Sequence, residues 1–203
     1  MRRFGPQLPF LLKVIAPGRA LSLQVHPSLE QAARGFEQEN AAGLAPDSPV
    51  RSFKDSNHKP EMVLALTRFE AVAGFRAPRR AAEVLGGLDS PPARRMRRTL
   101  RLNPTRFGIR QAFTELVSAD TRPEAAEMAE LVAEIAQRLA EGRSPSRRVD
   151  ANVVEMARAF PHDPGIAAAL LLNPVTLRRG EALFVPAGSV LPKIGRASCR
   201  ERV

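Results

Sequence analysis

The chain has few aromatic residues, and this shortage narrows the functions that its sequence allows. Among its 203 residues there is no tryptophan and no tyrosine, and phenylalanine occurs 10 times. Proteins that read single-stranded nucleic acid stack its bases on aromatic side chains, so stacking platforms are scarce here. The sequence also lacks the glycine-rich phosphate loops, the C-x-x-C pair and the G-x-S-x-G turn. Nucleotide-binding loops, zinc ribbons and serine-hydrolase elbows are therefore not expected.

Cysteine and long apolar runs are equally scarce. The single Cys199 excludes an internal disulfide framework and fits a reducing compartment, so we expect a cytoplasmic protein. No run approaches the roughly 18 apolar residues of a membrane span. Residues 9–18 are broken by Lys13 and Pro17 and carry no signal-peptide cleavage pattern. We therefore expect no membrane partner.

Positive charge is abundant, because 31 lysine and arginine residues against 21 acidic ones give a formal charge of +10. This balance suits either a nucleic-acid partner or a phosphorylated substrate. A GC-rich genome also produces arginine-rich chains, and with so few aromatic residues we expect no nucleic-acid partner. A basic, helical nucleic-acid-binding protein stays open as an alternative. Its binding surface would be the arginine-rich segment, which contains Arg94, Arg95, Arg97, Arg98, Arg101, Arg106 and Arg110.

The first part of the chain has the pattern of strands around one short helix. Strands are predicted over residues 8–16, 20–26 and 60–75. Ser28-Leu29-Glu30-Gln31 is a capping box that predicts a helix through about Asn40. The segment that follows, residues 41–58, is too rich in proline, aspartate and serine to be regular.

Residues 79–172 are helical in character, and strand character returns over 176–188 with a turn at Arg179-Gly180. Thr121-Arg122-Pro123-Glu124 predicts a second capping box. An apolar face then recurs at three- and four-residue spacing until Gly142 ends the helix. Strands, a helical insertion and further strands predict an α+β chain whose β part is interrupted.

Two short motifs carry groups that bind metals. In residues 21–28, Gln24 and His26 share one face of an extended segment, because strand side chains alternate. In residues 55–61, Lys59 and Glu61 share a face, and Pro60 restricts Lys59 to extended backbone. A glutamine oxygen, an imidazole and a carboxylate form a mixed ligand set that Zn²⁺ accepts. Taken alone, however, the spacing favours a solvated turn before a strand.

The order of four sequence blocks adds a family resemblance. LPFLLKVIA, LSLQVHPSLEQAARGFEQENAAG and KDSNHKPEMVLALTRFEAVAGFR resemble type I mannose-6-phosphate isomerase (phosphomannose isomerase). DPGIAAALLLNPVTLRRGEALFVPAG is similar to a later segment of that family. The likeness covers residues 8 to about 188, and Q-x-H-P followed by N-H-K-P-E is more specific than either half.

The resemblance implies a zinc enzyme that interconverts mannose 6-phosphate and fructose 6-phosphate. It implies a partial cupin (jelly-roll) β-domain with a helical insertion. Gln24, His26 and Glu61 fall on three of the family's four zinc-ligand positions, and Lys59 lies beside the metal as a catalytic group. Ser22 and Lys13 fall on substrate-binding positions.

The chemistry explains these residue types. Aldose–ketose isomerisation moves a proton between neighbouring carbons through an enediol. A divalent cation polarises the carbonyl, and a nearby lysine stabilises developing charge. These residues do not identify the general base, and the oligomeric state is not predicted.

The chain departs from the family near its end. The fourth ligand, a histidine expected near Leu191, is not present, and neither is the family's catalytic arginine. We therefore expect a truncated chain that is inactive as it stands. A cupin-type module that holds sugar or metal without turnover stays open.

The resemblance also suggests a domain division. We expect a first part of the cupin domain with the metal ligands (1–78), a helical domain (79–173), return strands (174–192) and a non-native tail (193–203). The tail has no apolar periodicity, and it matches the translation of a common sequencing-adapter read-through.

Overall fold

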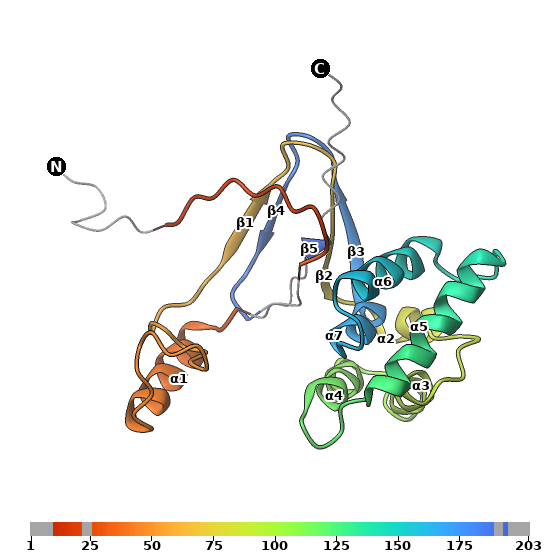
Figure 1. Ribbon diagram of the computed structural model, residues 1–203, viewed down its shortest axis with the longest axis horizontal. Helices are drawn as coiled ribbons and strands as arrows, with labels where there is room; N and C mark the ends of the chain where they lie inside the picture. The colour runs from red at the N-terminus through yellow and green to blue at the C-terminus, as the bar shows by residue number, and fades with distance from the viewer. Residues whose placement is uncertain (1–9, 22–25, 189–192, 195–203) are drawn as a thin grey trace.

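Strands that precede residues 78–171 pair with strands that follow them; the helices of residues 78–168 lie on one side of these strands, and the helix of residues 29–41 lies on the other (Figure 1). The structure is a computed structural model that describes residues 10–21, 26–188 and 193–194. The described elements, in chain order, are α1 (Leu29–Ala41), β1 (Glu61–Leu64), β2 (Phe69–Phe75), α2 (Pro78–Val84), α3 (Pro91–Leu102), α4 (Arg106–Val117), α5 (Ala125–Ala140), α6 (Arg147–Ala159), α7 (Gly165–Ala168), the 3-10 turn η1 (Ala169–Leu171), β3 (Leu172–Leu177), β4 (Ala182–Val185) and β5 (Lys193–Ile194).

The strands form two small antiparallel sheets. β1 pairs with β4, with Glu61 opposite Val185, and β2 lies between β3 and β5. Both β1 and β2 therefore pair with strands that follow the helices in sequence. The helices α2 to α7 form an insertion between paired strands, and the predicted α+β class is confirmed.

The strand predictions are corrected at two places. Residues 10–16, predicted as a strand, carry no strand assignment, and Leu11, Leu12 and Val14 are exposed. Apolar residues alone do not make a strand, which also needs a partner for its backbone groups. The predicted strand over 60–75 is two strands in different sheets. Its break is fixed because Ala65 accepts from the N–H of Gly180 and donates to Glu181.

The helix signals were more accurate than the strand signals. The Ser28 capping box is confirmed, with Ser28 N–H donating to Gln31 Oε1 and Gln31 N–H to Ser28 Oγ. The second predicted box is wrong by one turn, because α5 is capped by Glu124 and Glu127. The Thr121 hydroxyl instead donates to the carbonyl of Glu115.

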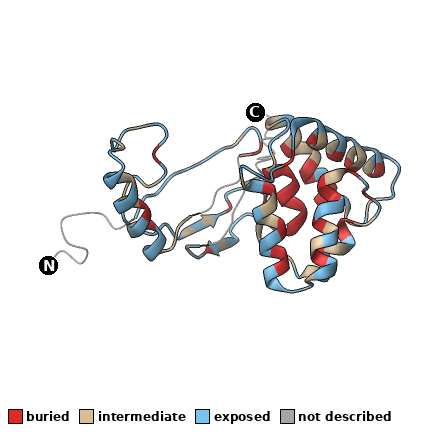
Figure 2. Ribbon diagram, turned by 90° about the horizontal axis from the view of Figure 1, so that it is seen from below, coloured by how far each residue is buried: buried red, intermediate tan, exposed pale blue. Residues whose placement is uncertain are grey.

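The main core lies among the helices, whose buried residues face one another in Figure 2. The apolar face of α5 contributes Met128, Leu131 and Ile135, each fully buried. A buried ion pair crosses this core: Arg138 Nε lies 2.7 Å from Asp150 Oδ2, and Nη1 donates to the carbonyl of Gly86. No helix within the described residues is long and apolar enough to cross a membrane.

Candidate metal and substrate site

His26 and Glu61 are far apart in sequence, yet their side chains meet at one end of the β1–β4 sheet. His26 Nε2 lies 3.2 Å from Glu61 Oε1. Two backbone interactions produce this convergence. Glu61 is paired opposite Val185, and the N–H of Gly188, three residues further on, donates to the carbonyl of His26 at 2.7 Å. The end of β4 therefore holds both residues.

The contact between the two side chains does not give the imidazole of His26 a hydrogen bond. Nε2 of His26 is buried and makes no hydrogen bond within the described part of the chain, although Glu61 Oε1 is close. A buried imidazole nitrogen without a hydrogen bond is costly unless a further group completes its environment. A divalent cation shared by the ring nitrogen and the carboxylate is one such group, and both are common zinc ligands.

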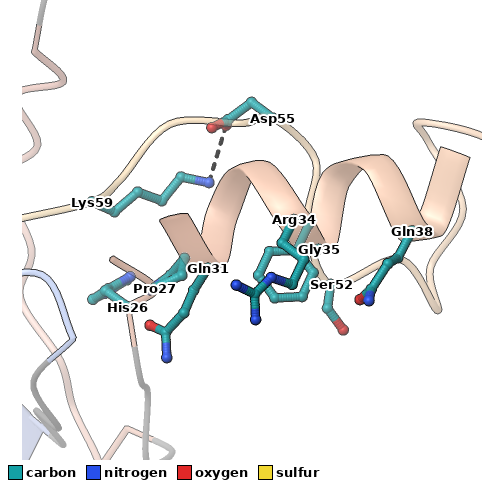
Figure 3. A pocket seen from close by; sticks show the side chains of 10 residues that line it. His26, Pro27, Gln31, Arg34, Gly35, Gln38, Ser52, Asp55 and Lys59 are labelled. Carbon is teal, nitrogen blue, oxygen red and sulfur yellow. Dashed lines mark ion pairs between the residues drawn. The ribbon is translucent and has the colours of Figure 1, made fainter. Parts of the chain in front are cut away.

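His26 also lines a pocket of about 590 Å³ along one side of α1. Figure 3 shows this pocket, in which Gln31, Arg34, Gln38 and Ser52 extend to the same side of the helix. The remaining lining residues are Pro27, Gly35, Phe53, Asp55 and Lys59. The side chain of His26 therefore lines the same pocket as the amide and guanidinium groups on the polar side of α1.

The wall of the pocket depends on a glycine in α1. The ring of Phe53 packs so closely on Gly35 that an added Cβ would lie 2.5 Å from its carbon atoms. Only a residue without a side chain allows this approach. Gly35 therefore lets the segment after α1 fold back onto the helix.

Arg51 fastens the same segment from inside. Its side chain is fully buried and donates to Leu44 O at 2.7 Å, Phe53 O at 2.7 Å and Asn40 Oδ1 at 2.6 Å. Its guanidinium also lies 4.8 Å from the ring centroid of Phe36. A buried arginine with three hydrogen bonds fixes the segment between α1 and β1 against α1.

Glu39 on α1 completes this anchor. Its carboxylate accepts from the N–H groups of Ser52 and Phe53 at 3.0 and 2.8 Å. Burial works to raise the pKa of Glu39, but these two hydrogen bonds, with Arg51 nearby, hold the pKa below its usual value.

Lys59 reaches the pocket and forms an ion pair there. Its Nζ lies 3.0 Å from Asp55 Oδ2, and both side chains are partly exposed (Figure 3). The backbone N–H of Asn57 and the ammonium of Lys59 lower the pKa of Asp55. Lys59 therefore lines the same pocket as His26, two residues before Glu61.

Of the other predicted site residues, the structure describes Lys13 alone. Lys13 lies in the exposed segment 10–16 and does not line the pocket. Ser22, Gln24 and Leu191 lie outside the described residues. Within the described residues, no three histidine, cysteine or acidic side chains cluster as metal ligands. His26 and Glu61 are a pair, for which Gln24 was the predicted third member.

The sequence interpretation overlooked the polar side of α1 and the buried Arg51. Gln31, Arg34 and Gln38 recur at three- and four-residue spacing, which places them on one face of a helix. That spacing was a signal available in the sequence. No comparable signal marks Arg51, because its partners come from three separate places in the chain.

Comparison with known proteins gives the class of protein first: the similar solved structures are sugar-phosphate isomerases. The apo form of mannose 6-phosphate isomerase from Salmonella typhimurium superposes with a TM-score of 0.75 at 29% identity, over 89% of this chain and 44% of that one. A structure of that enzyme bound to fructose 6-phosphate and zinc gives a TM-score of 0.70 at the same identity and coverage.

Sequence comparison gives the family. Residues 1–78 match the model of the phosphomannose isomerase type I catalytic domain. The chain is 35% identical to mannose-6-phosphate isomerase of Salmonella typhimurium over 90% of its length, and 33% identical to that of Escherichia coli over 91%. These matches confirm the resemblance to type I phosphomannose isomerase that its motifs indicated. The chain spans about 44% of the length of these relatives.

Proposed function

We propose that this chain carries the metal-binding part of a zinc-dependent aldose–ketose isomerase that interconverts mannose 6-phosphate and fructose 6-phosphate. The observation that carries the proposal is the meeting of His26 Nε2 and Glu61 Oε1 at 3.2 Å beside a polar pocket. The relatives named above bear the corresponding enzyme name, and one solved relative holds fructose 6-phosphate and zinc.

We further propose that the strands belong to a cupin jelly roll interrupted by the helices. The pairing of β1 with β4, and of β2 with β3, across the helical insertion supports this. The division at residues 78, 173 and 192 and the non-native tail from 193 stay predictions. The insertion α2 to η1 runs from residue 78 to 171, and the backbone of Lys193–Ile194 pairs with β2.

Gln24, His26 and Glu61 would hold the zinc ion. The buried Nε2 of His26, which has no hydrogen bond, and the adjacent carboxylate of Glu61 fit zinc, a cation that accepts both nitrogen and oxygen ligands. When bound, zinc supplies a Lewis acid that polarises the substrate carbonyl.

The protein's own groups would orient the substrate and stabilise its charge. Lys59, which lines the pocket, would stabilise negative charge that develops on the substrate oxygens. Asp55 holds Lys59 in this position at 3.0 Å. Ser22 and Lys13 are proposed to contact the substrate at the positions implied by the family.

The comparisons favour neither alternative function. A nucleic-acid-binding protein built on the arginine-rich segment is not supported by any relative or solved structure named above. A cupin module without turnover would share the metal pair, so activity of the whole protein separates it from the enzyme.

Zinc binding tests the proposal. We expect the 203-residue chain to bind one zinc ion and, with zinc, fructose 6-phosphate, as measured by isothermal titration calorimetry. His26→Ala and Glu61→Gln should each weaken zinc binding by about 10- to 100-fold, whereas the matched control His58→Ala, an exposed histidine, should not. Equal zinc affinity in all four proteins would refute the site. Turnover by this chain alone would support the function and overturn only the expected inactivity.

A further inference from the structure

Helix α3 concentrates positive charge on one face without a matching acid. Its sequence, PPARRMRRTLRL, contains five arginines and no acidic residue. Arg94, Arg98 and Arg101 are spaced at i, i+4 and i+7, which places them on one face of the helix, and all three are exposed. A basic composition explains how many arginines the chain has, but not their concentration on one helix.

Acidic residues from neighbouring segments neutralise part of this charge. Glu127 on α5 accepts two hydrogen bonds from Arg95, at 2.8 and 3.0 Å. Asp89, just before α3, lies 3.4 Å from Arg97. These contacts leave three of the five guanidinium groups to be accounted for.

The remaining three arginines have no carboxylate partner among the described residues. Arg94 donates to the backbone carbonyl of Asp89, which is a neutral acceptor. The side chains of Arg98 and Arg101 make no hydrogen bond or ion pair within the described part of the chain. The exposed face of α3 therefore keeps a net positive charge.

This arrangement is unfavourable for an isolated helix. Like charges at i, i+4, as in the pairs Arg94–Arg98 and Arg97–Arg101, destabilise a helix. Arg94 also lies near the positive end of the helix dipole, and the first turn carries no acidic residue. A bound anion would relieve both effects.

The same arginines line a hollow in the surface. This α3 hollow has a volume of about 490 Å³ and is lined by Pro91, Arg94, Arg95, Arg97, Arg98 and Arg101. Arg94 and Arg101 lie about 10 Å apart along the helix axis at about 1.5 Å per residue. Since no aromatic residue lines the hollow, it offers no surface on which nucleic-acid bases stack. Its shape and charge fit a small, elongated anion.

The α3 hollow is separate from the candidate metal site. None of its lining residues lines the pocket along α1. In Figure 1, α3 lies farther from β1 and β4 than α4 does. A ligand of this hollow is therefore held apart from His26 and Glu61.

We propose that the α3 hollow is a second binding site, which takes a chain of two or three linked phosphates, either free or carried by a nucleotide. A planar guanidinium donates two parallel hydrogen bonds to one phosphate group, and successive arginines on the helix face would hold successive phosphates. Linked phosphates also concentrate several negative charges opposite the three unpaired guanidinium groups. The proposal does not depend on the isomerase function.

Isothermal titration calorimetry of the 203-residue chain with inorganic triphosphate tests the proposal, at low ionic strength and without zinc, which triphosphate chelates. We expect Arg98→Gln to weaken binding by about 10-fold, and the double variant Arg94→Gln/Arg98→Gln by about 100-fold. The control Arg79→Gln/Arg110→Gln removes the same charge from exposed arginines outside the hollow and should change binding by less than about 3-fold.

Three further measurements sharpen the test. Circular dichroism should show unchanged helix content in all variants, because the substituted side chains are exposed. His26→Ala should leave triphosphate binding unchanged, so failure of the metal site and failure of the α3 hollow are distinguishable. ATP that binds as tightly as triphosphate identifies the phosphate chain as the recognised part, and ATP that binds more tightly identifies a nucleotide as its source.

Four results would overturn the proposal. These are no detectable triphosphate binding by the unchanged chain, an equal loss in the control double variant, tighter binding of duplex DNA than of triphosphate, and equally tight binding of polyglutamate. The last two would assign the arginines of α3 to a nucleic acid or to an acidic protein surface instead.

Discussion

The helical insertion and the strand region bury their apolar residues to very different extents. The helices enclose a continuous core that includes Leu131, Ile135 and Met156. Among the described residues, the core between the sheets has a much smaller set of buried members: Ala65, Phe69, Ala71, Leu177 and Val185. On the outer face of β1 and β4, Met62 and Phe184 lie opposite each other and are 70% and 59% exposed. The metal and substrate site therefore lies in the region with less hydrophobic stabilisation.

This difference indicates that the two regions are held by different forces. The helices gain stability from apolar burial, which is proportional to area. The site region relies on particular polar anchors, above all Arg51 and Glu39, which fix the segment between α1 and β1. Single polar substitutions should therefore alter the site without unfolding the helices.

The largest expected effect is on the helical core. Asp150→Ala leaves Arg138 buried without its carboxylate partner, and we expect the free energy of unfolding to fall by about 3–5 kcal/mol. Urea denaturation followed by circular dichroism measures this. The exposed pair Arg80–Glu83 supplies the control, because Glu83→Ala should cost less than about 1 kcal/mol. Equal costs would contradict the contrast between buried and exposed pairs.

The next effect separates the site region from the helices. Arg51→Ala removes three hydrogen bonds and leaves the carbonyls of Leu44 and Phe53 without their buried donor, at a local cost of about 1–3 kcal/mol for each unsatisfied group. Hydrogen exchange should accelerate over residues 42–60 and zinc affinity should fall, while exchange in α5 stays unchanged. Exchange that accelerates in α5 as much as in 42–60 would show that the two regions are not separable.

Acidification should loosen the same segment. Since the folded pKa of Glu39 is lowered, its stabilising effect is present above the ordinary value of 4.5 and is lost as the pH falls through the lowered folded value. Amide exchange at Ser52 and Phe53, corrected for intrinsic rates, should show this loss below about pH 4.5. Glu39→Gln should flatten the dependence, and a variant with the same pH profile as the unchanged chain would refute the role of Glu39.

The smallest effect on stability should come from the exposed face of β1 and β4. Phe184→Thr removes an exposed aromatic ring and should change the free energy of unfolding by about 0.5 kcal/mol or less. We expect it to reduce the tendency to aggregate, because exposed apolar strand faces promote association. Light scattering on heating measures this, and unchanged aggregation would show that other surfaces are responsible.

The start of α1 could be predicted from local signals, but the pairing of strands could not. The Ser28 capping box involves residues three apart, so its letters determine its geometry. The break between β1 and β2 depends on Gly180 and Glu181, more than a hundred residues away. Arg51 was missed for a different reason: its three acceptors lie within 11 residues of it, but they follow no regular spacing that marks a buried arginine.

Prediction of the candidate site from local sequence meets the same difficulty, because its residues are brought together by distant parts of the chain. The two motifs indicated that His26 and Glu61 are metal-capable, while their convergence required the end of β4 to hold both. The resemblance to a family supplied the expectation that they meet. The polar side of α1 was overlooked because glutamine and arginine on an exposed helix face are ordinary, and only the fold shows that they line a pocket with His26.

X-ray absorption at the zinc edge, or a crystal structure of the zinc-loaded chain, tests the central claim most directly. Our account predicts zinc bound by His26 Nε2 at about 2.0–2.1 Å and by a Glu61 oxygen at about 2.0–2.2 Å. Zinc bound at other residues, with His26 and Glu61 still in contact with each other, would contradict it.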